Sequence, residues 1–345
     1  MMVVISVVTF ALLQAAAASS LSYPQKQACP SPFGNINVHG AHLYPENIEF
    51  DPKRCLTYIG NMYDATVSVY DAIQDRITEV ITIDGVTGHQ EFHVSGLQLD
   101  ARHDKLSIIA NAGAAFDTFG ADVSGTNYLV QYDLRTRKVE WKSNLTAVSQ
   151  GAYGGFQDVE HDAAGNSFVI GSYPSSIVKV SADGKKAEAW YTIANTKTTV
   201  SGFSGIAAFN DGRTALVNDD GGRIFVFDLT AKKGTPVHLP LQAGAEPISN
   251  NTDASYLPAL YKNTVYLVSD DAFGTIVLRS HNNWKTAEKL GVIPNAYAGQ
   301  AFTTATVQIG DRLYVLSGFF LDNPHTRADF PLYDITDDVN KLLQQ

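Results

Sequence analysis

One pattern occurs six times along the chain, at intervals of about 50 residues. Each copy has a short apolar stretch, a polar or turn-like step, and a β-rich stretch that ends in small or acidic residues. The copies lie at residues 47–61, 96–111, 158–172, 205–219, 257–270 and 304–318. A period of this length, built from short strands, is typical of a β-propeller in which each repeat forms one four-stranded sheet. The repeat predicts an all-β fold of six four-stranded antiparallel blades around a central channel, with seven blades as the alternative.

Further strands are expected between the repeats. Third strands are predicted at 66–72, 128–136, 176–184, 223–230 and 275–281, and fainter fourth strands at 77–83, 138–144 and 187–193. Apolar and polar residues alternate in these stretches, and turn residues lie where hairpins need them. The sixth blade is incomplete, so we expect either FGNINVHGAHL (33–43) or ADFPLYDIT (328–336) to complete it. Only residues 334–345 have a helical pattern.

Composition limits the class of protein. Of the 345 residues, 45% are hydrophobic and only 17% are charged, which is typical of a compact, turn-rich domain. We expect residues 21–345 to form one domain because each blade packs against its neighbours. The net charge of −10 argues against a nucleic-acid partner, since phosphate binding needs a basic face.

The N-terminal residues indicate secretion. Residues 1–20 form an apolar run that ends in small residues, as in a cleaved signal peptide, and the run is too short for a comfortable membrane span. The mature chain has two cysteines, Cys29 and Cys55, which an oxidising compartment would join in one disulfide; two unpaired core thiols are the alternative. Asn144 and Asn250 begin N-glycosylation sequons.

Propeller geometry predicts where a site would lie. The start of each inner strand and the end of each second strand meet at one mouth of the channel, and the loops after the second strands form a lid. The residues expected to line a pocket there are Glu46, Asn47, Tyr63, His93, Phe116, Phe119, Gln157, Asp158, Ser204, Asp219, Asp270, Thr304, Phe319 and Phe320. A polar floor with an aromatic rim suits a small organic molecule. Asp220 and Asp271, which follow Asp219 and Asp270, are interpreted as turn residues.

Three segments resemble the blade motifs of the gluconolactonase and senescence-marker protein family: YPENIEFD (44–51), QDVEHDAAGN (157–166) and residues 205–219. That resemblance implies a divalent metal on the channel axis, held by one Glu, two Asn and one Asp. Glu46 and Asp219 match the acidic ligands, but Gln157 and Ser204 replace the two asparagines. A serine hydroxyl is a poor substitute for an amide carbonyl around a hard cation, so we expect no metal.

A second resemblance covers nearly the whole mature chain. The stretch from Ala28 to Asp71, with Cys, Pro, FGN, LYPEN and a second Cys in order, is similar to a fungal secreted-type propeller family of natural-product clusters. That family includes the trichothecene-cluster protein and the hetero-Diels-Alderases of tropolone sesquiterpenoid biosynthesis. The resemblance implies a six-bladed propeller without a cofactor that acts on a terpenoid or polyketide intermediate.

These observations together favour a cofactor-independent pericyclase. The chain has no dinucleotide-binding glycine motif, P-loop or nucleophile elbow. The resemblance implies a reaction that joins a tropolone quinone methide to a sesquiterpene such as a humulene, and we expect Glu46 or Asp219 to be the acid that assists loss of water. The alternatives are another terpenoid cyclase of the trichothecene-cluster type, a metal-dependent lactonase-like hydrolase, and a secreted binding propeller without catalysis.

Overall fold

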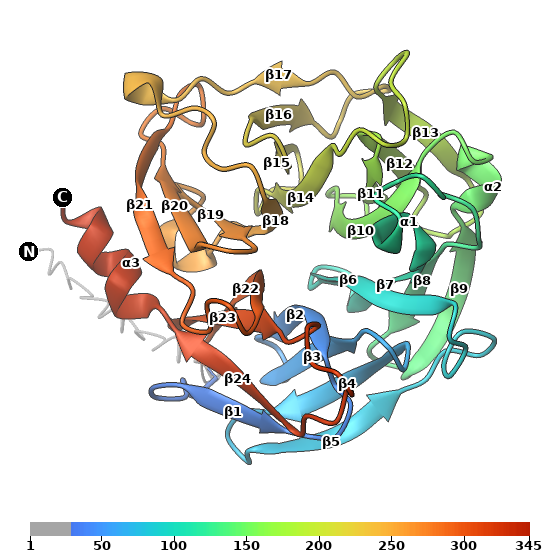
Figure 1. The fold of residues 1–345 in the computed structure, drawn as a ribbon, viewed down its shortest axis with the longest axis horizontal. Coiled ribbons are helices and arrows are strands. Elements are labelled where there is room, and N and C mark those ends of the chain that lie inside the picture. Colours follow the sequence, from blue (N-terminus) through green and yellow to red (C-terminus); the bar gives the residue numbers. More distant parts are fainter. Residues whose placement is uncertain (1–28) are drawn as a thin grey trace, which may run out of the picture.

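Six four-stranded antiparallel sheets surround a central axis, which confirms the six-bladed propeller (Figure 1). The structure is a computed structural model that describes residues 29–345. In five blades the strands follow chain order from the axis outward. The expected signal peptide, residues 1–20, lies outside the described residues.

The strands fall into four classes by their distance from the axis. The inner strands are β2 (Pro45–Asp51), β6 (Phe92–Asp100), β10 (Gly154–His161), β14 (Phe203–Ala208), β18 (Thr252–Tyr256) and β22 (Phe302–Ile309). The second strands are β3 (Leu56–Asn61), β7 (Lys105–Ala112), β11 (Ser167–Tyr173), β15 (Thr214–Asp219), β19 (Val265–Asp270) and β23 (Arg312–Gly318). The third strands are β4 (Thr66–Asp71), β8 (Tyr128–Asp133), β12 (Ser176–Val180), β16 (Ile224–Asp228), β20 (Gly274–Arg279) and β24 (Asp329–Asp334). The outer strands are β5 (Arg76–Ile81), β9 (Lys138–Asn144), β13 (Ala187–Thr192), β17 (Val237–His238), β21 (Glu288–Pro294) and β1 (Ile36–His39).

The ring is closed by both ends of the chain. The sixth blade has the order β1-β24-β23-β22, so both of the candidate segments complete it rather than one of them. Figure 1 shows blue β1 beside red β24. In their register Val38 lies opposite Phe330, and both side chains are buried. Because residues alternate in a strand, Asn37 and His39 face solvent.

Helices occupy little of the chain. The predicted C-terminal helix is present as α3 (Thr336–Leu343), and its Val339 packs in a cluster with side chains of β19 and β23. The other helices are single turns, α1 (Ala114–Asp117), α2 (Thr146–Ser149), η1 (Gln242–Gly244) and η2 (Ala259–Tyr261). Within residues 29–345, no helix has the length and apolar character that crossing a membrane requires.

Hydrophobic contacts between neighbouring blades hold the ring together. One buried cluster joins Tyr58 and Val67 of the first blade to Leu97 and Ile108 of the second. Another joins the third and fourth blades around the buried indole of Trp190. Burying apolar side chains is worth about 25 cal/mol per Å² removed from water, so each interface stabilises both of the blades that form it.

A disulfide joins Cys29 to Cys55, as expected, and Cys55 lies in the turn between β2 and β3. The N-terminal arm that carries Cys29 also contacts the sixth blade, since the Ser31 hydroxyl accepts a hydrogen bond from the Asp311 amide at 3.0 Å. The disulfide therefore ties the first blade to the arm that leads into the closing strand.

Replacing both cysteines by serine is expected to lower the free energy of unfolding by about 3–4 kcal/mol, because the bridge closes a loop with a sequence separation of 26 residues. Denaturant unfolding of the purified variant measures the loss. A reducing agent should lower the stability of the native protein by a similar amount and leave the double variant unchanged. Equal unfolding midpoints for the two proteins would contradict this prediction.

Candidate functional site

Each of the six inner strands has a β-bulge at the same end. The register with the second strand shifts after Pro45, Val94, Phe156, Phe203, Thr252 and Thr303. A bulge inserts an unpaired residue and re-aims its side chain. The bulges hold Glu46, Ser95, Gln157, Ser204, Asp253 and Thr304, and all six line one cavity at the mouth of the channel. These six residues form the floor of what we call the cup.

The wall of the cup comes from residues that follow the second strands and from two long loops. Tyr63, Asp220 and Asp271 lie just beyond β3, β15 and β19, and Phe116 and Phe320 come from the loops after β7 and β23. The cavity has a volume of about 360 Å³, which is in the range of small-molecule sites. The remaining lining residues are Met62, His93, Asn111, Asp117, Ser172, Tyr173, Ser201, Thr252 and Phe302.

Several hydrogen-bond donors of the cup are occupied by the protein itself. Gln157 Nε2 donates to the Ser204 carbonyl at 2.7 Å, and the Ser172 hydroxyl donates to the Phe203 carbonyl at 2.7 Å. The Thr252 hydroxyl donates to the Asp219 carbonyl, also at 2.7 Å. These bonds join neighbouring blades, so the polar floor has a structural role as well.

Three buried oxygen atoms of the cup have no hydrogen-bond partner among the described residues. They are Glu46 Oε2, Asn111 Oδ1 and Thr304 Oγ1. The Asn111 amide nitrogen donates to the Phe156 carbonyl at 2.9 Å, which orients its oxygen as the free acceptor. Buried polar atoms are nearly always paired, so these three atoms are the groups of the cup that are free to bond to a water molecule or a ligand.

Four carboxyl groups of the cup have raised pKa values. Burial raises the pKa of Glu46 and of Asp253 well above the usual range, and mutual repulsion adds to the effect. Burial, followed by repulsion from Asp270 and Asp220, raises the pKa of Asp271 to about 7. The pKa of Asp220 is raised by burial as well. The cup therefore holds carboxylic acids that keep a proton near neutral pH.

Aromatic rings form the upper wall. Tyr63 and His93 meet edge to face with ring centroids 5.6 Å apart, and Phe116 meets Tyr173 similarly at 5.8 Å. Burial lowers the pKa of His93, so its imidazole is neutral at pH 7. Polar acids at the floor and aromatic rings above them suit a molecule that has an oxygenated end and a hydrocarbon body.

Eight residues predicted from the sequence to line the pocket do so: Glu46, Tyr63, His93, Phe116, Gln157, Ser204, Thr304 and Phe320. The sequence placed them there because inner-strand starts and second-strand ends share one mouth of the channel. Whether they bind a substrate stays a prediction.

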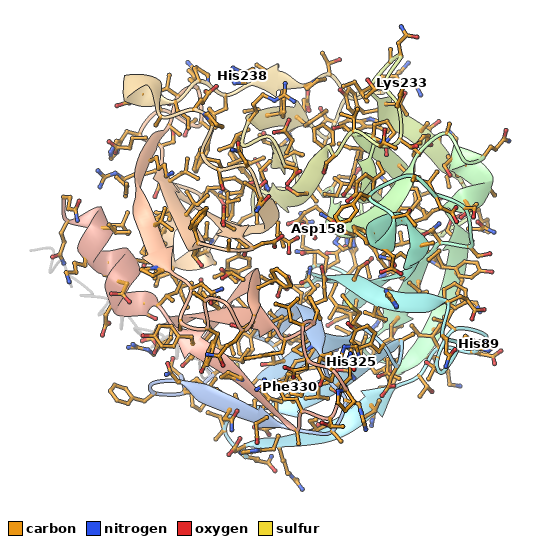
Figure 2. All side chains as sticks on the ribbon, viewed as in Figure 1. His89, Asp158, Lys233, His238, His325 and Phe330 are labelled. Atoms are coloured by element: carbon orange, nitrogen blue, oxygen red, sulfur yellow. A yellow bond between two sulfur atoms is a disulfide. The ribbon has the colours of Figure 1, made fainter. Side chains whose placement is uncertain are left out.

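Three of the other predicted residues have structural positions outside the cup. The side chain of Asn47 accepts a hydrogen bond from the Ile48 amide at 2.7 Å. Asp158 lies near the centre of the ring (Figure 2), where its carboxylate accepts bonds from the backbone amides of Val159 and Ile206. Phe119 is 76% exposed, and its side chain is not part of the cup lining.

In each of two adjacent aspartate pairs, the prediction chose the wrong residue for the pocket. Asp219 and Asp270 were expected to line it. Asp219 accepts bonds from Arg223, with Nε at 2.8 Å, and Asp270 caps its turn through the Phe273 amide at 2.7 Å. Their neighbours Asp220 and Asp271, interpreted as turn residues, line the cup instead. Successive side chains of an extended chain point to opposite sides, so only one member of each pair can face the cavity.

Phe319 also differs from its prediction. It is buried in the core of the closing blade, where the guanidinium of Arg327 lies 3.7 Å from the centre of its ring. Phe320, the next residue, provides the aromatic contact with the cup.

Two floor residues, Ser95 and Asp253, were not predicted. Ser95 lies one residue before the repeat that begins at residue 96. Asp253 belongs to β18, whose sequence TDASY is short and polar, and the apolar segment after it was taken for the inner strand. The repeat could have revealed this strand, because Thr252 and Asp253 lie about 50 positions after Ser204, which is one repeat further along the chain.

The residues at the metal positions of the gluconolactonase family do not fit a divalent ion. The Asp219 carboxylate is bound by Arg223, and Gln157 donates to a backbone carbonyl. The Ser204 hydroxyl is bonded to Thr252 Oγ1 and Asn218 Nδ2, each at 2.8 Å. Among residues 29–345, no group of three His, Cys, Asp or Glu side chains is arranged to hold a metal.

Both sequon asparagines, Asn144 and Asn250, are exposed in the fold. Their glycosylation and the secretion of the chain stay predictions.

Known proteins resemble this chain over most of its length. The model of the family described as Mal s 1 allergenic protein-like matches residues 25–290. Trichothecene biosynthesis protein 14 of Trichoderma arundinaceum is 33% identical, with 92% of each chain covered. The major allergen Mal f 1 of Malassezia furfur is 27% identical, over 88% of this chain and 91% of the allergen.

Solved structures share the fold. The major allergen Mala s 1 of Malassezia sympodialis superposes with a TM-score of 0.77 at 23% identity, over 88% of this chain and 96% of the allergen. Regucalcin, a calcium-binding protein of Agrobacterium tumefaciens, superposes with a TM-score of 0.55 at 20% identity, over 87% of this chain and 94% of regucalcin. Because the family match spans most of the propeller and the Trichoderma relative aligns over nearly the whole chain, the protein belongs to the Mal s 1-like family of fungal six-bladed propellers.

Proposed function

We propose that this protein is a cofactor-independent cyclase of natural-product biosynthesis, with the cup as its active site. The observation that carries the proposal is the group of protonatable carboxyls, Glu46, Asp220, Asp253 and Asp271, in one cavity with several aromatic rings. The relative from Trichoderma arundinaceum, named as a trichothecene biosynthesis protein, supports the same class of pathway.

The proposed chemistry begins with acid-assisted loss of water. Asp271 donates its proton to a hydroxyl group of the substrate, the C–O bond breaks, and water leaves with the bonding electron pair. The neutral imidazole of His93, which also lines the cup, accepts a proton from another hydroxyl group of the substrate. In a hydroxymethyl tropolone this sequence forms a neutral quinone methide, and the proton count is unchanged. General acid catalysis of such a step contributes roughly 10²–10⁴-fold in rate.

The second step is closure of a ring. In the specific form that we propose, the quinone methide adds to an alkene of a sesquiterpene such as a humulene in a hetero-Diels-Alder cycloaddition. Two bonds form in this step without a nucleophile from the protein. Holding the two partners in a reactive orientation can lower the barrier by up to about 7–11 kcal/mol.

A second candidate is intramolecular closure, in which a hydroxyl group of one terpenoid attacks its own dehydrated carbon. The volume of about 360 Å³ favours this candidate, because it lies near the lower end of the range for small-molecule sites. A single compact molecule would fill the cup, whereas two partners would extend toward its open mouth.

The test supplies each class of substrate with and without the protein. One arm contains a hydroxymethyl tropolone and humulene, and the other contains a polyhydroxylated sesquiterpene; chiral chromatography separates the products. Acceleration or a changed isomer ratio in the first arm supports the cycloaddition, and in the second arm the intramolecular closure. Rates and isomer ratios that match the protein-free tubes in both arms would identify a binding propeller instead.

Phe116→Ala should change the isomer ratio more than the rate, because the ring positions the hydrocarbon body and takes no part in proton transfer. A tenfold selectivity needs only about 1.4 kcal/mol between competing transition states. Phe119→Ala is the matched control, since Phe119 belongs to the same loop but is 76% exposed and outside the cup. An unchanged ratio in Phe116→Ala would contradict this placement of the substrate.

A further inference from the structure

The cup is lined by acidic side chains and by hydrogen-bond acceptors. Five carboxyl groups line it, those of Glu46, Asp117, Asp220, Asp253 and Asp271. None of the described residues that line it is lysine or arginine. We propose that the cup is a binding site for organic cations, and that it takes a protonated amine with a compact hydrocarbon body in preference to its neutral or anionic counterpart.

Two buried oxygen atoms support this proposal independently of the acidic groups. Asn111 is 1% exposed and Thr304 is 2% exposed, and both line the cup. Asn111 Oδ1 and Thr304 Oγ1 have no partner among the described residues, although the Asn111 amide nitrogen is bonded twice within the protein. The Asn111 amide oxygen can only accept, so a ligand N–H would satisfy it, and the Thr304 hydroxyl can accept from the same ligand group.

Neutral donors for an anionic ligand are scarce on the same floor. The amide of Gln157 and the hydroxyls of Ser172 and Thr252 already donate to backbone carbonyls. An anion would therefore meet repulsion from the carboxyl groups that are ionised, and the donors left to it are the Thr304 hydroxyl and the carboxyls that keep a proton. The site discriminates against phosphorylated and diphosphorylated substrates, whose binding needs basic side chains, helix N-termini or metal ions.

The aromatic wall suits a cation as well. Tyr63, Phe116, Tyr173 and Phe320 line the cup above the acids. The face of an aromatic ring attracts a cation, and the attraction grows as the site excludes water. Carboxylates below and ring faces above are the groups that recognise an ammonium ion with an apolar body.

Binding of a cation should expel protons from the cup. Glu46 and Asp253 repel each other, and Asp271 is repelled by Asp270 and Asp220, so these acids hold protons partly to relieve repulsion. The other titratable groups facing them are Asp117, His93, Tyr63, Tyr173 and the buried Asp158. A bound positive charge restores the ionised form, and affinity therefore rises with pH through the region near pH 7.

The proposed cation site is the same cup as the proposed active site, and its relevance to catalysis rests on the proposed function. If the reaction passes through a positively charged intermediate, the same acids and rings stabilise that charge, and a stable ammonium ion is its analogue. Binding of a stable cation can be measured without any turnover, so the two proposals can fail separately.

The experiment is isothermal titration of the full mature protein with 1-adamantylamine, 1-adamantanol and 1-adamantanecarboxylate, three ligands that share one compact hydrocarbon cage. At pH 8 the amine is expected to bind about tenfold more tightly than the alcohol, and the carboxylate least tightly. At pH 5 the amine remains protonated but Asp271, whose pKa is raised to about 7, does not ionise, so the difference should shrink to about twofold. Repeating the titration in two buffers of different ionisation enthalpy should show proton release for the amine alone.

Asp271→Asn and Asp220→Asn should each reduce the preference for the amine by about threefold or more, since each removes one negative charge from the wall. Asp84→Asn removes an equal charge from an exposed loop position outside the cup and should leave the preference unchanged. Equal affinity of the amine and the alcohol at pH 8 would overturn the proposal, as would failure of the amine to bind. If the amine binds but the cyclase assay gives no product, the cation site is supported and only the proposed cyclase reaction is contradicted.

Discussion

Replacing Asp271 by asparagine is expected to slow the dehydration step by about 10²-fold or more, the usual contribution of a positioned general acid. Among the acids of the cup, Asp271 has a pKa raised to about 7, so near neutral pH it is both protonated and able to give its proton away. Asparagine preserves the shape of the side chain but cannot transfer that proton. Single-turnover measurements with the dehydrating substrate report this step directly.

The pH dependence gives the prediction a second readout. The donor is the protonated form, so the rate of the native protein should be highest below pH 7 and fall about tenfold per unit well above it. Asp271→Asn should be slow at every pH and lose this fall. Asp84→Asn is the control for the change in net charge, because Asp84 does not line the cup. An unchanged rate in Asp271→Asn would reassign the acid to Glu46, Asp220 or Asp253.

Val38→Asp is expected to destabilise the propeller by about 3–5 kcal/mol, the typical penalty for an uncompensated buried charge. Val38 is 1% exposed and lies opposite Phe330 in the pairing of β1 with β24. This pairing joins the two ends of the chain, so its loss leaves the sixth blade without its outer strand. Because each blade packs against two neighbours, we expect the whole ring to unfold in one transition at a lower denaturant concentration.

Val80→Asp makes the same chemical change at an exposed position. Val80 is 48% exposed on the outer strand β5 of the adjacent blade, so its substitution should shift the free energy of unfolding by less than about 0.5 kcal/mol. Chemical denaturation followed by tryptophan fluorescence compares the two variants. Similar midpoints for Val38→Asp and the native protein would show that β1 does not close the ring.

The repeat alone predicted the number of blades and the mouth of the channel at which polar residues gather. It could do so because a six-fold period and the alternation of strand residues are properties of the linear sequence. For the same reason Glu46, Gln157, Ser204 and Thr304 were placed correctly at the pocket. A repeat shows where each residue lies within its strand, and therefore which residues lie at the channel mouth.

Which member of an adjacent pair faces the cup was decided by the tertiary structure. Asp219 and Asp220 have the same chemistry, as do Asp270 and Asp271, and the sequence cannot show which carboxylate its turn will bind. A bulge of one residue reverses the side to which the following side chains point.

The sequence by itself predicted an all-β ring of six blades with seven as the alternative, a disulfide between Cys29 and Cys55, and a polar channel mouth, and the structure confirms six blades and the disulfide. The tertiary structure decided that both chain ends complete the sixth blade, that Asp253 from the polar strand β18 joins Glu46 at the floor, and that their pKa values rise together. The physical reason is that the groups concerned lie far apart along the chain and meet only in the folded ring. Local patterns fix strands and turns, whereas burial and repulsion between carboxyl groups about 200 residues apart exist only once the ring has closed.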